Sequence, residues 1–294
     1  MSKIIISGFA DEISSDFDKQ LEVVRELGMD HISLRSADGK GIADYTAEEF
    51  AEKLLPRLDE AQVKISSMGS PIGKIPVDSE EDFEKQKKQL EEICKMCQLS
   101  GCRYIRMFSF YIPKDENPDD YKDQVIAKLK EFEAIARKYE VVLLHENEKD
   151  IYGDIARRCK VIFDEIPSPY LKAAFDFANF VQCKEDTKEC WEMLKEHVVY
   201  IHIKDAVYTD NENVLCGTGD GKIEQLLKQA ICDEGYEGFL TLEPHLVRFD
   251  TLASLETEST ENIIKENKAK DGAEGYSMQY HALLDILNRI GLEK

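Results

Sequence analysis

The stretch that decides the fold is VVLLHENE, residues 141–148. Four apolar residues are followed at once by polar and acidic ones, and Gly153 comes shortly afterwards. Short continuous apolar runs are typical of parallel strands that are buried on both faces. In a barrel of such strands, polar residues at the C-terminal strand ends line the site. The stretch therefore predicts a buried parallel strand that delivers Glu146 to a site.

The same pattern occurs three more times, as LKAAFD at 171–176, VVYIH at 198–202 and FLTLE at 239–243. Each run ends in a polar residue that has the chemistry of a metal ligand. The spacing between these ends is about one strand-and-helix unit per step. The four strand ends are Glu146, Asp176, His202 and Glu243.

The remaining chain alternates strands and helices in the same way. Four earlier strands are predicted at 3–9, 31–34, 64–68 and 103–108. Amphipathic helices are predicted at 16–27, 46–61, 79–99, 119–139, 154–163, 186–197, 222–232 and 274–290, with a polar segment at 249–270. Eight such units without an internal linker predict an α/β protein with a single (β/α)8 TIM barrel over residues 1–294. A doubly wound open sheet is the alternative, but no G-x-G-x-x-G follows the first strand.

Composition narrows the classes of partner. The formal charge of −21 and the pI near 4.8 argue against nucleic acid, whose phosphates would be repelled. No apolar run is long enough to span a membrane, and the N-terminus does not resemble a signal peptide. We therefore expect a cytoplasmic protein without a membrane partner. Its eight cysteines are expected to be reduced, and a homo-oligomer stays open.

Strand alternation predicts which side chains point into the barrel. If Glu146 faces inward, so do Val142 and Leu144, while His145 points toward the helices. The same argument places Ala174 with Asp176, Tyr200 and Lys204 with His202, and Thr241 with Glu243.

Three carboxylates and one imidazole are therefore expected to converge on the barrel axis. Such a cluster is costly in like-charge repulsion unless a cation neutralises it. An oxygen-rich set with one histidine favours Mn²⁺, and it also suits Mg²⁺, Co²⁺ or Zn²⁺. The predicted ligands of this divalent metal are Glu146, Asp176, His202 and Glu243.

The four strand ends, read as HENE, FD, YIHIKD and LEPH, resemble the xylose isomerase-like TIM-barrel superfamily, which includes sugar isomerases and epimerases. GFADEI near the N-terminus and GSPIGK at 69–74 extend the resemblance over essentially the whole chain. The resemblance implies a divalent metal on the same four residues, with Glu146 and Glu243 doubling as acid–base groups. Many epimerases of the superfamily have a histidine where this chain has Asn179.

The predicted function is a divalent-metal-dependent isomerase or epimerase of a sugar, keto-sugar or sugar acid. Glu146 and Glu243 would move a proton next to a carbonyl, through a metal-stabilised enediolate. A dehydratase acting on a keto-sugar or cyclitol is the alternative. An abasic-site endonuclease and a non-catalytic sugar-binding subunit fit less well, given the acidity and the complete ligand set.

Further polar strand-end residues could bind the small-molecule sugar or only solvate the rim. They are Lys204, Arg106, Lys74, Glu12 and Arg35. Lys204 would steady an oxyanion or pair with a neighbouring acid. GTGDG at 217–221 is either a phosphate-binding loop or a plain turn. The aromatic residues Phe108, Phe110, Phe177, Phe180 and Trp191 are candidates for a pocket wall, with helix packing as the simpler explanation for Trp191.

Overall fold

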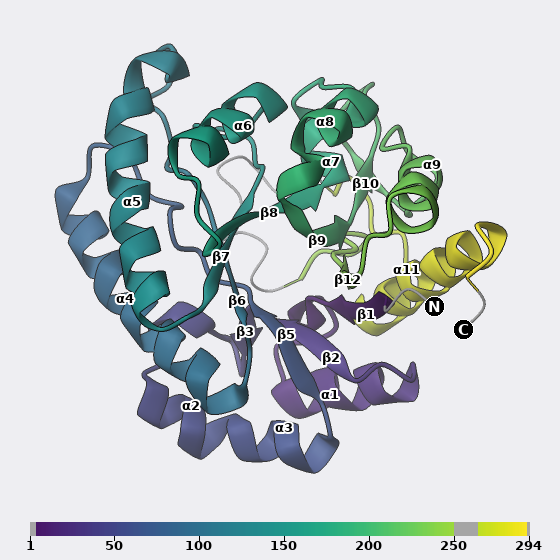
Figure 1. Ribbon diagram of the computed structural model, residues 1–294. Coiled ribbons are helices and arrows are strands. Elements are labelled where there is room, and N and C mark those ends of the chain that lie inside the picture. Colours follow the sequence, from purple (N-terminus) through teal and green to yellow (C-terminus); the bar gives the residue numbers. More distant parts are fainter. Residues whose placement is uncertain (1–3, 250–263, 293–294) are drawn as a thin grey trace.

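The computed structural model describes residues 4–249 and 264–292, and in it eight parallel strands form a nearly closed barrel (Figure 1). Seven parallel pairings join them in the order β1-β12-β9-β8-β7-β6-β5-β2. The strands are β1 Ile4–Gly8, β2 His31–Leu34, β5 Lys64–Met68, β6 Tyr104–Met107, β7 Val142–Glu146, β8 Leu171–Asp176, β9 Val198–Ile203 and β12 Gly238–Leu242. The (β/α)8 barrel prediction is confirmed.

The backbone pairing of the barrel is sparse at two junctions. β5 and β6 share a single registered pair, and β1 and β2 are joined by an isolated bridge between Phe9 and Ser33. β7, β8, β9 and β12 are consecutive in the sheet, away from both junctions. The strands that carry the predicted metal ligands are therefore neighbours in space.

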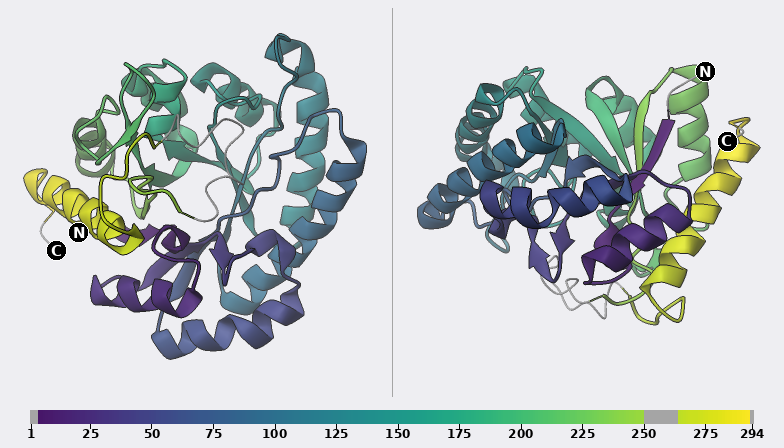
Figure 2. Two further views of the ribbon diagram at one scale, coloured as in Figure 1. Left: turned by 180° about the vertical axis from the view of Figure 1, so that it is seen from behind. Right: turned by 90° about the horizontal axis from the view of Figure 1, so that it is seen from below.

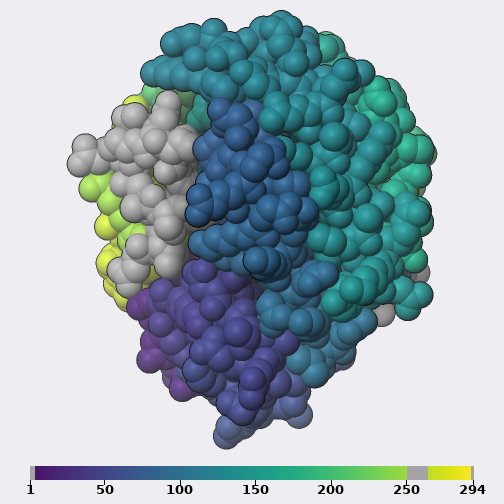
Figure 3. All heavy atoms as spheres, turned by 90° about the vertical axis from the view of Figure 1, so that its left-hand side faces the viewer, coloured from purple at the N-terminus to yellow at the C-terminus, as the bar shows by residue number. Residues whose placement is uncertain are grey.

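Helices surround the strands, and Figures 1 and 2 show them on the outside of the barrel. Figure 3 looks onto the left-hand side of Figure 1 and shows purple, blue and teal segments in contact across that face. The α-helices are α1 Phe17–Glu26, α2 Ala47–Lys53, α3 Leu55–Ala61, α4 Glu80–Ser100, α5 Lys122–Lys138, α6 Ala156–Glu165, α7 Phe177–Gln182, α8 Thr187–Leu194, α9 Ile223–Leu227 and α11 Gly272–Arg289. Among the described residues, no helix is both long and apolar enough to cross a membrane.

Two helix predictions need correction. The helix expected at 46–61 begins at the predicted Thr46 capping box but breaks at Leu54, because Pro56 lacks an N–H and crowds the preceding turn. The helix expected at 222–232 is α9 followed by a π-helical turn, Lys228–Asp233. Of the polar segment expected at 249–270, residues 250–263 lie outside the described part of the chain.

The alternation argument holds inside the barrel. Val142, Leu144, Ala174 and Tyr200 form one buried apolar cluster, as predicted. His145 points the other way, with its ring 6.1 Å from that of Phe163 on α6. Two short antiparallel strand pairs lie in the loops after β2 and β9, and neither was predicted from the sequence. They are β3 Ser36–Ala37 with β4 Lys40–Gly41, and β10 Asp205–Ala206 with β11 Asn213–Val214.

Candidate metal centre

Four ligand-type side chains converge at the C-terminal end of the barrel. Each offers one ligand atom, and these atoms all lie within 4.8 Å of one another. Each side chain ends a strand or lies beside its end, and none is more than 3% exposed. They are the four predicted residues, Glu146, Asp176, His202 and Glu243.

The His202 imidazole lies among the three carboxylates. Its Nδ1 is 3.0 Å from Oε1 of Glu146, 3.5 Å from Oε2 of Glu243 and 3.8 Å from Oδ2 of Asp176. The ring of Phe9, which the sequence analysis did not single out, packs edge-on against His202 with ring centroids 5.2 Å apart. One ring nitrogen thus faces every carboxylate of the cluster.

The two oxygens of Asp176 have separate tasks. Oδ1 accepts a hydrogen bond from the backbone N–H of Asn179 at 2.8 Å and so caps the N-terminus of α7. Oδ2 accepts no hydrogen bond from the described residues, although Nζ of Lys204 lies 3.1 Å away. A buried carboxylate oxygen that faces the cluster without a hydrogen bond suits a metal ion.

Two asparagines hold the ligands in place. Asn147 accepts a hydrogen bond from the Asp176 N–H and donates to the Asp176 carbonyl, both at 3.0 Å, which links the ends of β7 and β8. Asn179 donates from Nδ2 to the Asn147 carbonyl at 2.8 Å and to Oε1 of Glu146 at 3.4 Å. Asn179, which stands where many epimerases have a histidine, therefore contacts a predicted ligand. Sequence reasoning missed the positioning role of Asn147, which lies inside the HENE motif.

Cationic side chains surround the carboxylates. Arg106 places Nη1 3.3 Å from Glu146 and 3.9 Å from Glu243. Lys204 places Nζ 3.1 Å from Asp176 and 3.4 Å from Glu243. Arg35 contacts Glu243 at 3.0 Å and Asp11 at 2.8 Å. The structure thus brings Lys204 and Arg106, both predicted to bind substrate, to the ligand cluster.

The charges shift the pKa values of the ligands in different directions. Burial alone would raise the pKa of Glu146, but His202 and Arg106 outweigh it and lower the pKa to about 2. Burial dominates at Asp176 and raises its pKa to about 7. Burial would lower the pKa of His202, but Glu146 and Glu243 raise it to about 9. The carboxylates thus favour positive charge at the point where they meet.

Glu12 lies beside this cluster in a second group with His245 and Glu243. Its Oε2 accepts a hydrogen bond from the His245 N–H at 2.7 Å, and burial raises the pKa of Glu12 to about 8. The Arg35 guanidinium already contacts both carboxylates, at 3.4 Å from Glu12 and 3.0 Å from Glu243. Glu243 belongs to both groups, so the second has only Glu12 and His245 of its own, and we assign no second ion to it.

Lys74 and the aromatic candidates divide into two sets. Nζ of Lys74 lies 3.2 Å from Glu148 and 4.5 Å from the centre of the Phe108 ring, and Arg106 lies over the same ring at 5.0 Å. Phe108 is thus beside the site. The other four pack on aromatic rings away from the cluster: Phe110 on Phe83 and Phe132, and Phe177, Phe180 and Trp191 on Phe175. For Trp191 this agrees with the simpler explanation, helix packing.

The glycine-rich loop at 217–221 does bind an anionic group, but that group is the side chain of Asp205 in the same chain. The carboxylate of Asp205 accepts hydrogen bonds from the backbone N–H groups of Gly217 and Gly219, both at 2.9 Å, and of Gly221 at 3.0 Å. A Cβ added to Gly219 would lie 2.4 Å from the same carboxylate. The loop is a structural turn around Asp205, which leaves its amides no room for a phosphate.

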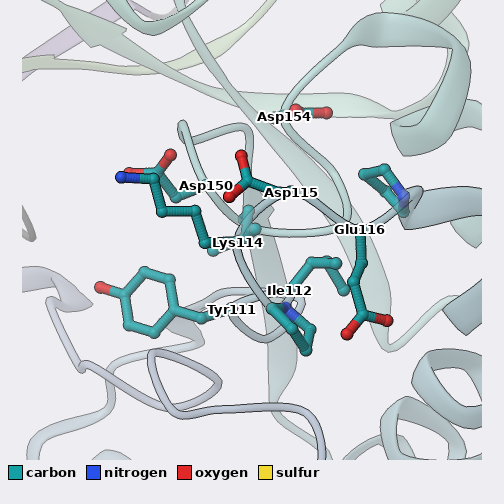
Figure 4. A pocket seen from close by; sticks show the side chains of 10 residues that line it. Tyr111, Ile112, Lys114, Asp115, Glu116, Asp150 and Asp154 are labelled. Atoms are coloured by element: carbon teal, nitrogen blue, oxygen red, sulfur yellow. The ribbon is translucent and has the colours of Figure 1, made fainter.

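A cavity of about 460 Å³ lies on the rim, between the loops that follow β6 and β7 (Figure 4). Figure 4 shows Lys114 and Asp150 on one side of it and Glu116 on the other. It is lined by Tyr111, Ile112, Pro113, Lys114, Asp115, Glu116, Pro118, Asp150, Ile151 and Asp154, which include none of the predicted site residues.

The fold and the site define a (β/α)8-barrel protein with a three-carboxylate, one-imidazole centre at its C-terminal face. The family model for the xylose isomerase-like TIM barrel matches residues 21–276. The chain belongs to the xylose isomerase-like TIM barrel family. No match is found among curated proteins.

Solved structures of similar fold cover nearly the whole chain. The IOLI protein with a binding zinc atom is 14% identical, with 99% of each chain covered and a TM-score of 0.74. An L-ribulose 3-epimerase is 17% identical, with 99% of this chain and 96% of the other covered and a TM-score of 0.73. The probable 3-DHS dehydratase AsbF from Bacillus anthracis is 13% identical, with 96% and 98% covered and a TM-score of 0.66. At these identities the likeness concerns the fold.

Proposed function

We propose that the protein is a divalent-metal-dependent sugar isomerase or epimerase. The observation that carries this proposal is the convergence of Glu146, Asp176, His202 and Glu243 within 4.8 Å in a buried site. Oxygen donors with one imidazole suit Mn²⁺ first and also Mg²⁺, Co²⁺ or Zn²⁺. The family match and the epimerase among the neighbours of similar fold support the proposal.

A divalent ion in this centre would supply Lewis acidity, which stabilises negative charge on a carbonyl oxygen when the adjacent carbon loses a proton. Glu146 and Glu243 are the proton-transfer groups of the proposal. They come from β7 and β12, which are separated in the sheet by β8 and β9, so they approach a bound sugar from different sides. Two bases on opposite sides give epimerisation, and one base gives 1,2-isomerisation.

The neighbouring side chains prepare the site for this step. Asn179 and Asn147 fix Glu146 and Asp176, so that their oxygens are already placed before substrate arrives. Arg106 and Lys204 contribute positive charge in a buried environment, where it acts strongly on a developing oxyanion. The proposed substrate is a small-molecule sugar, keto-sugar or sugar acid.

A dehydratase that acts on a keto-sugar or cyclitol is the second candidate. It needs the same proton abstraction by Glu146 or Glu243, followed by loss of a hydroxyl group on the next carbon. A neighbour of similar fold that is named as a probable dehydratase favours keeping this candidate. The two candidates differ in product, because elimination releases water whereas epimerisation and isomerisation conserve mass.

A panel of ketoses, keto-acids and keto-cyclitols in D2O with Mn²⁺ tests both candidates. We expect one deuterium to enter the carbon next to the carbonyl of at least one compound, with the mass otherwise unchanged for an isomerase or epimerase. A product lighter by one water identifies the dehydratase. Protein that has bound metal and gives neither deuterium incorporation nor a product lighter by one water across the panel would contradict both.

A further inference from the structure

Arg106 and Lys204 differ from the other cationic side chains of the site in the carboxylates with which they form ion pairs. Each is 3% exposed. Within ion-pair distance, Arg106 contacts Glu146 and Glu243, and Lys204 contacts Asp176 and Glu243. Among the described residues, every one of these carboxylates is a predicted metal ligand.

Arg35 and Lys74 provide the contrast. Arg35 also pairs with Asp11 at 2.8 Å, and Lys74 pairs with Glu148 at 3.2 Å. Neither Asp11 nor Glu148 belongs to the ligand cluster. Arg35 and Lys74 would therefore keep a carboxylate partner when the ligands turn to a metal ion.

Metal binding changes the charge around Arg106 and Lys204. A bound divalent cation is the largest local charge in such a site and draws the carboxylate oxygens to itself. The ligand carboxylates of Glu146, Asp176 and Glu243 carry three negative charges, whereas the ion, Arg106 and Lys204 together carry four positive ones. Arg106 would keep the uncharged backbone carbonyls of Ser70 and Gly69 as acceptors. A buried charge that loses its carboxylate partner is nevertheless strongly unfavourable.

We infer that the substrate carries an anionic group, a carboxylate or a phosphate, that pairs with Arg106 and Lys204 once the metal is bound. This inference rests on the proposed function and narrows its substrate to an acidic or phosphorylated sugar. Arg106 and Lys74 both lie over the Phe108 ring, so two cations meet on that side of the site. An arginine fork and a lysine are both well suited to oxyanions.

The test uses small probes that do not depend on sugar stereochemistry. Calorimetric titration of the Mn²⁺-loaded protein with glycolate, inorganic phosphate and the neutral analogue glycolamide would be compared in wild type, Arg106→Gln, Lys204→Gln and the exposed control Lys88→Gln. We expect each site variant to bind glycolate or phosphate about 10-fold or more weakly, which corresponds to the loss of one charge-assisted contact. Glycolamide affinity should be unchanged in all four proteins. Whichever of glycolate and phosphate shows the larger loss identifies the anion.

A second readout separates a lost contact from a damaged site. Arg106 and Lys204 compete with the ion for the same carboxylates, so Mn²⁺ affinity should stay equal or rise in both site variants. Weaker Mn²⁺ binding, equal loss of glycolamide, or undiminished anion binding in both variants would overturn the inference. If wild-type protein binds no divalent metal, it is the proposed function that fails.

Discussion

Arg35 donates a hydrogen bond from Nη1 to Oε1 of Glu243 over 3.0 Å, although 208 residues separate them. Arg35 follows β2 and Glu243 follows β12, so the bond spans β1 and crosses the seam between β1 and β2, where the backbone pairing is an isolated bridge. The same guanidinium contacts Asp11 and Glu12, which follow β1. One buried side chain thus ties together three strand ends where the backbone ladder is interrupted.

Replacing Arg35 with methionine should therefore destabilise the barrel. Removing one partner of a buried ion pair typically costs about 3–5 kcal/mol, because the other charge is left uncompensated. The matched control is Arg57→Met, since Arg57 pairs with Asp18 and Asp38 at the surface and should cost at most about 1 kcal/mol. Urea unfolding measures both, and equal losses would show that Arg35 does not hold the seam.

His202→Ala should abolish stoichiometric binding of a divalent metal. Its Nδ1 faces all three carboxylates, so its loss removes the central donor of the cluster. Elemental analysis of protein purified without chelators checks this, with the exposed His281→Ala as control. Equal metal content in wild type and both variants would show that the ion binds elsewhere.

Glu146→Gln and Glu243→Gln should each retain part of the metal but lower turnover by about 100-fold or more, because the amide keeps an oxygen and loses the base. Solvent deuterium exchange at the substrate carbon then separates one base from two. If only one glutamate acts, exchange persists in the variant of the other. Near-normal turnover in both variants would remove these residues from the proton-transfer step.

His145 should make the protein acid-sensitive in a defined window. Burial lowers its pKa from 6.5 to about 4. Between these two pH values the unfolded chain binds a proton on His145 and the native chain does not. The free energy of unfolding should therefore fall by about 3 kcal/mol as pH drops from 6.5 to 4, and stay unaffected above 6.5.

The variant His145→Gln isolates this effect, because an amide can still bond the Ser109 hydroxyl, which lies 2.9 Å from Nε2 of His145. Subtracting its pH profile from that of wild type removes the contribution of the other titrating groups. A difference profile that is flat between pH 4 and 6.5 would contradict the native pKa of about 4.

Asp205→Ala should destabilise the fold more than a surface substitution does. The Asp205 carboxylate accepts the N–H groups of Gly217, Gly219 and Gly221, and its removal leaves these donors without their acceptor. A buried donor left unsatisfied costs about 1–3 kcal/mol, so we expect a total loss of at least about 2 kcal/mol. Asp210→Ala, on the exposed part of the same region, is the control for thermal unfolding. A similar melting temperature for the two variants would contradict the structural role.

The strand ends were predictable from sequence because buried parallel strands occur as short apolar runs, and each run ends where polar residues begin. Alternation then placed Val142, Leu144, Ala174 and Tyr200 inside the barrel, and the structure agrees. The convergence of Glu146, Asp176, His202 and Glu243 follows from the same regularity, because they lie at neighbouring strand ends. The helix break before Pro56 could also have been predicted from the proline, but the amphipathic pattern continues through this position and favoured a single helix.

The partners of the side chains could not be predicted in the same way. Nothing local in GTGDG shows that its amides surround Asp205, because the chain must first fold back from β9. Arg35 and Glu243 are likewise joined only by barrel closure. Phe9 is apolar and belongs to no polar strand-end pattern, yet its ring packs against His202 and lies under both Arg35 and Arg106.

The division of labour at Asp176 makes this position useful for engineering. One oxygen caps the N-terminus of α7 and the other faces the cluster, so helix capping and the proposed metal binding use different atoms of one side chain. Asp176→Asn would keep an oxygen for the helix cap while removing the charge. The substitution would give a folded protein with an inactive centre, which could be used to trap a bound sugar for crystallography.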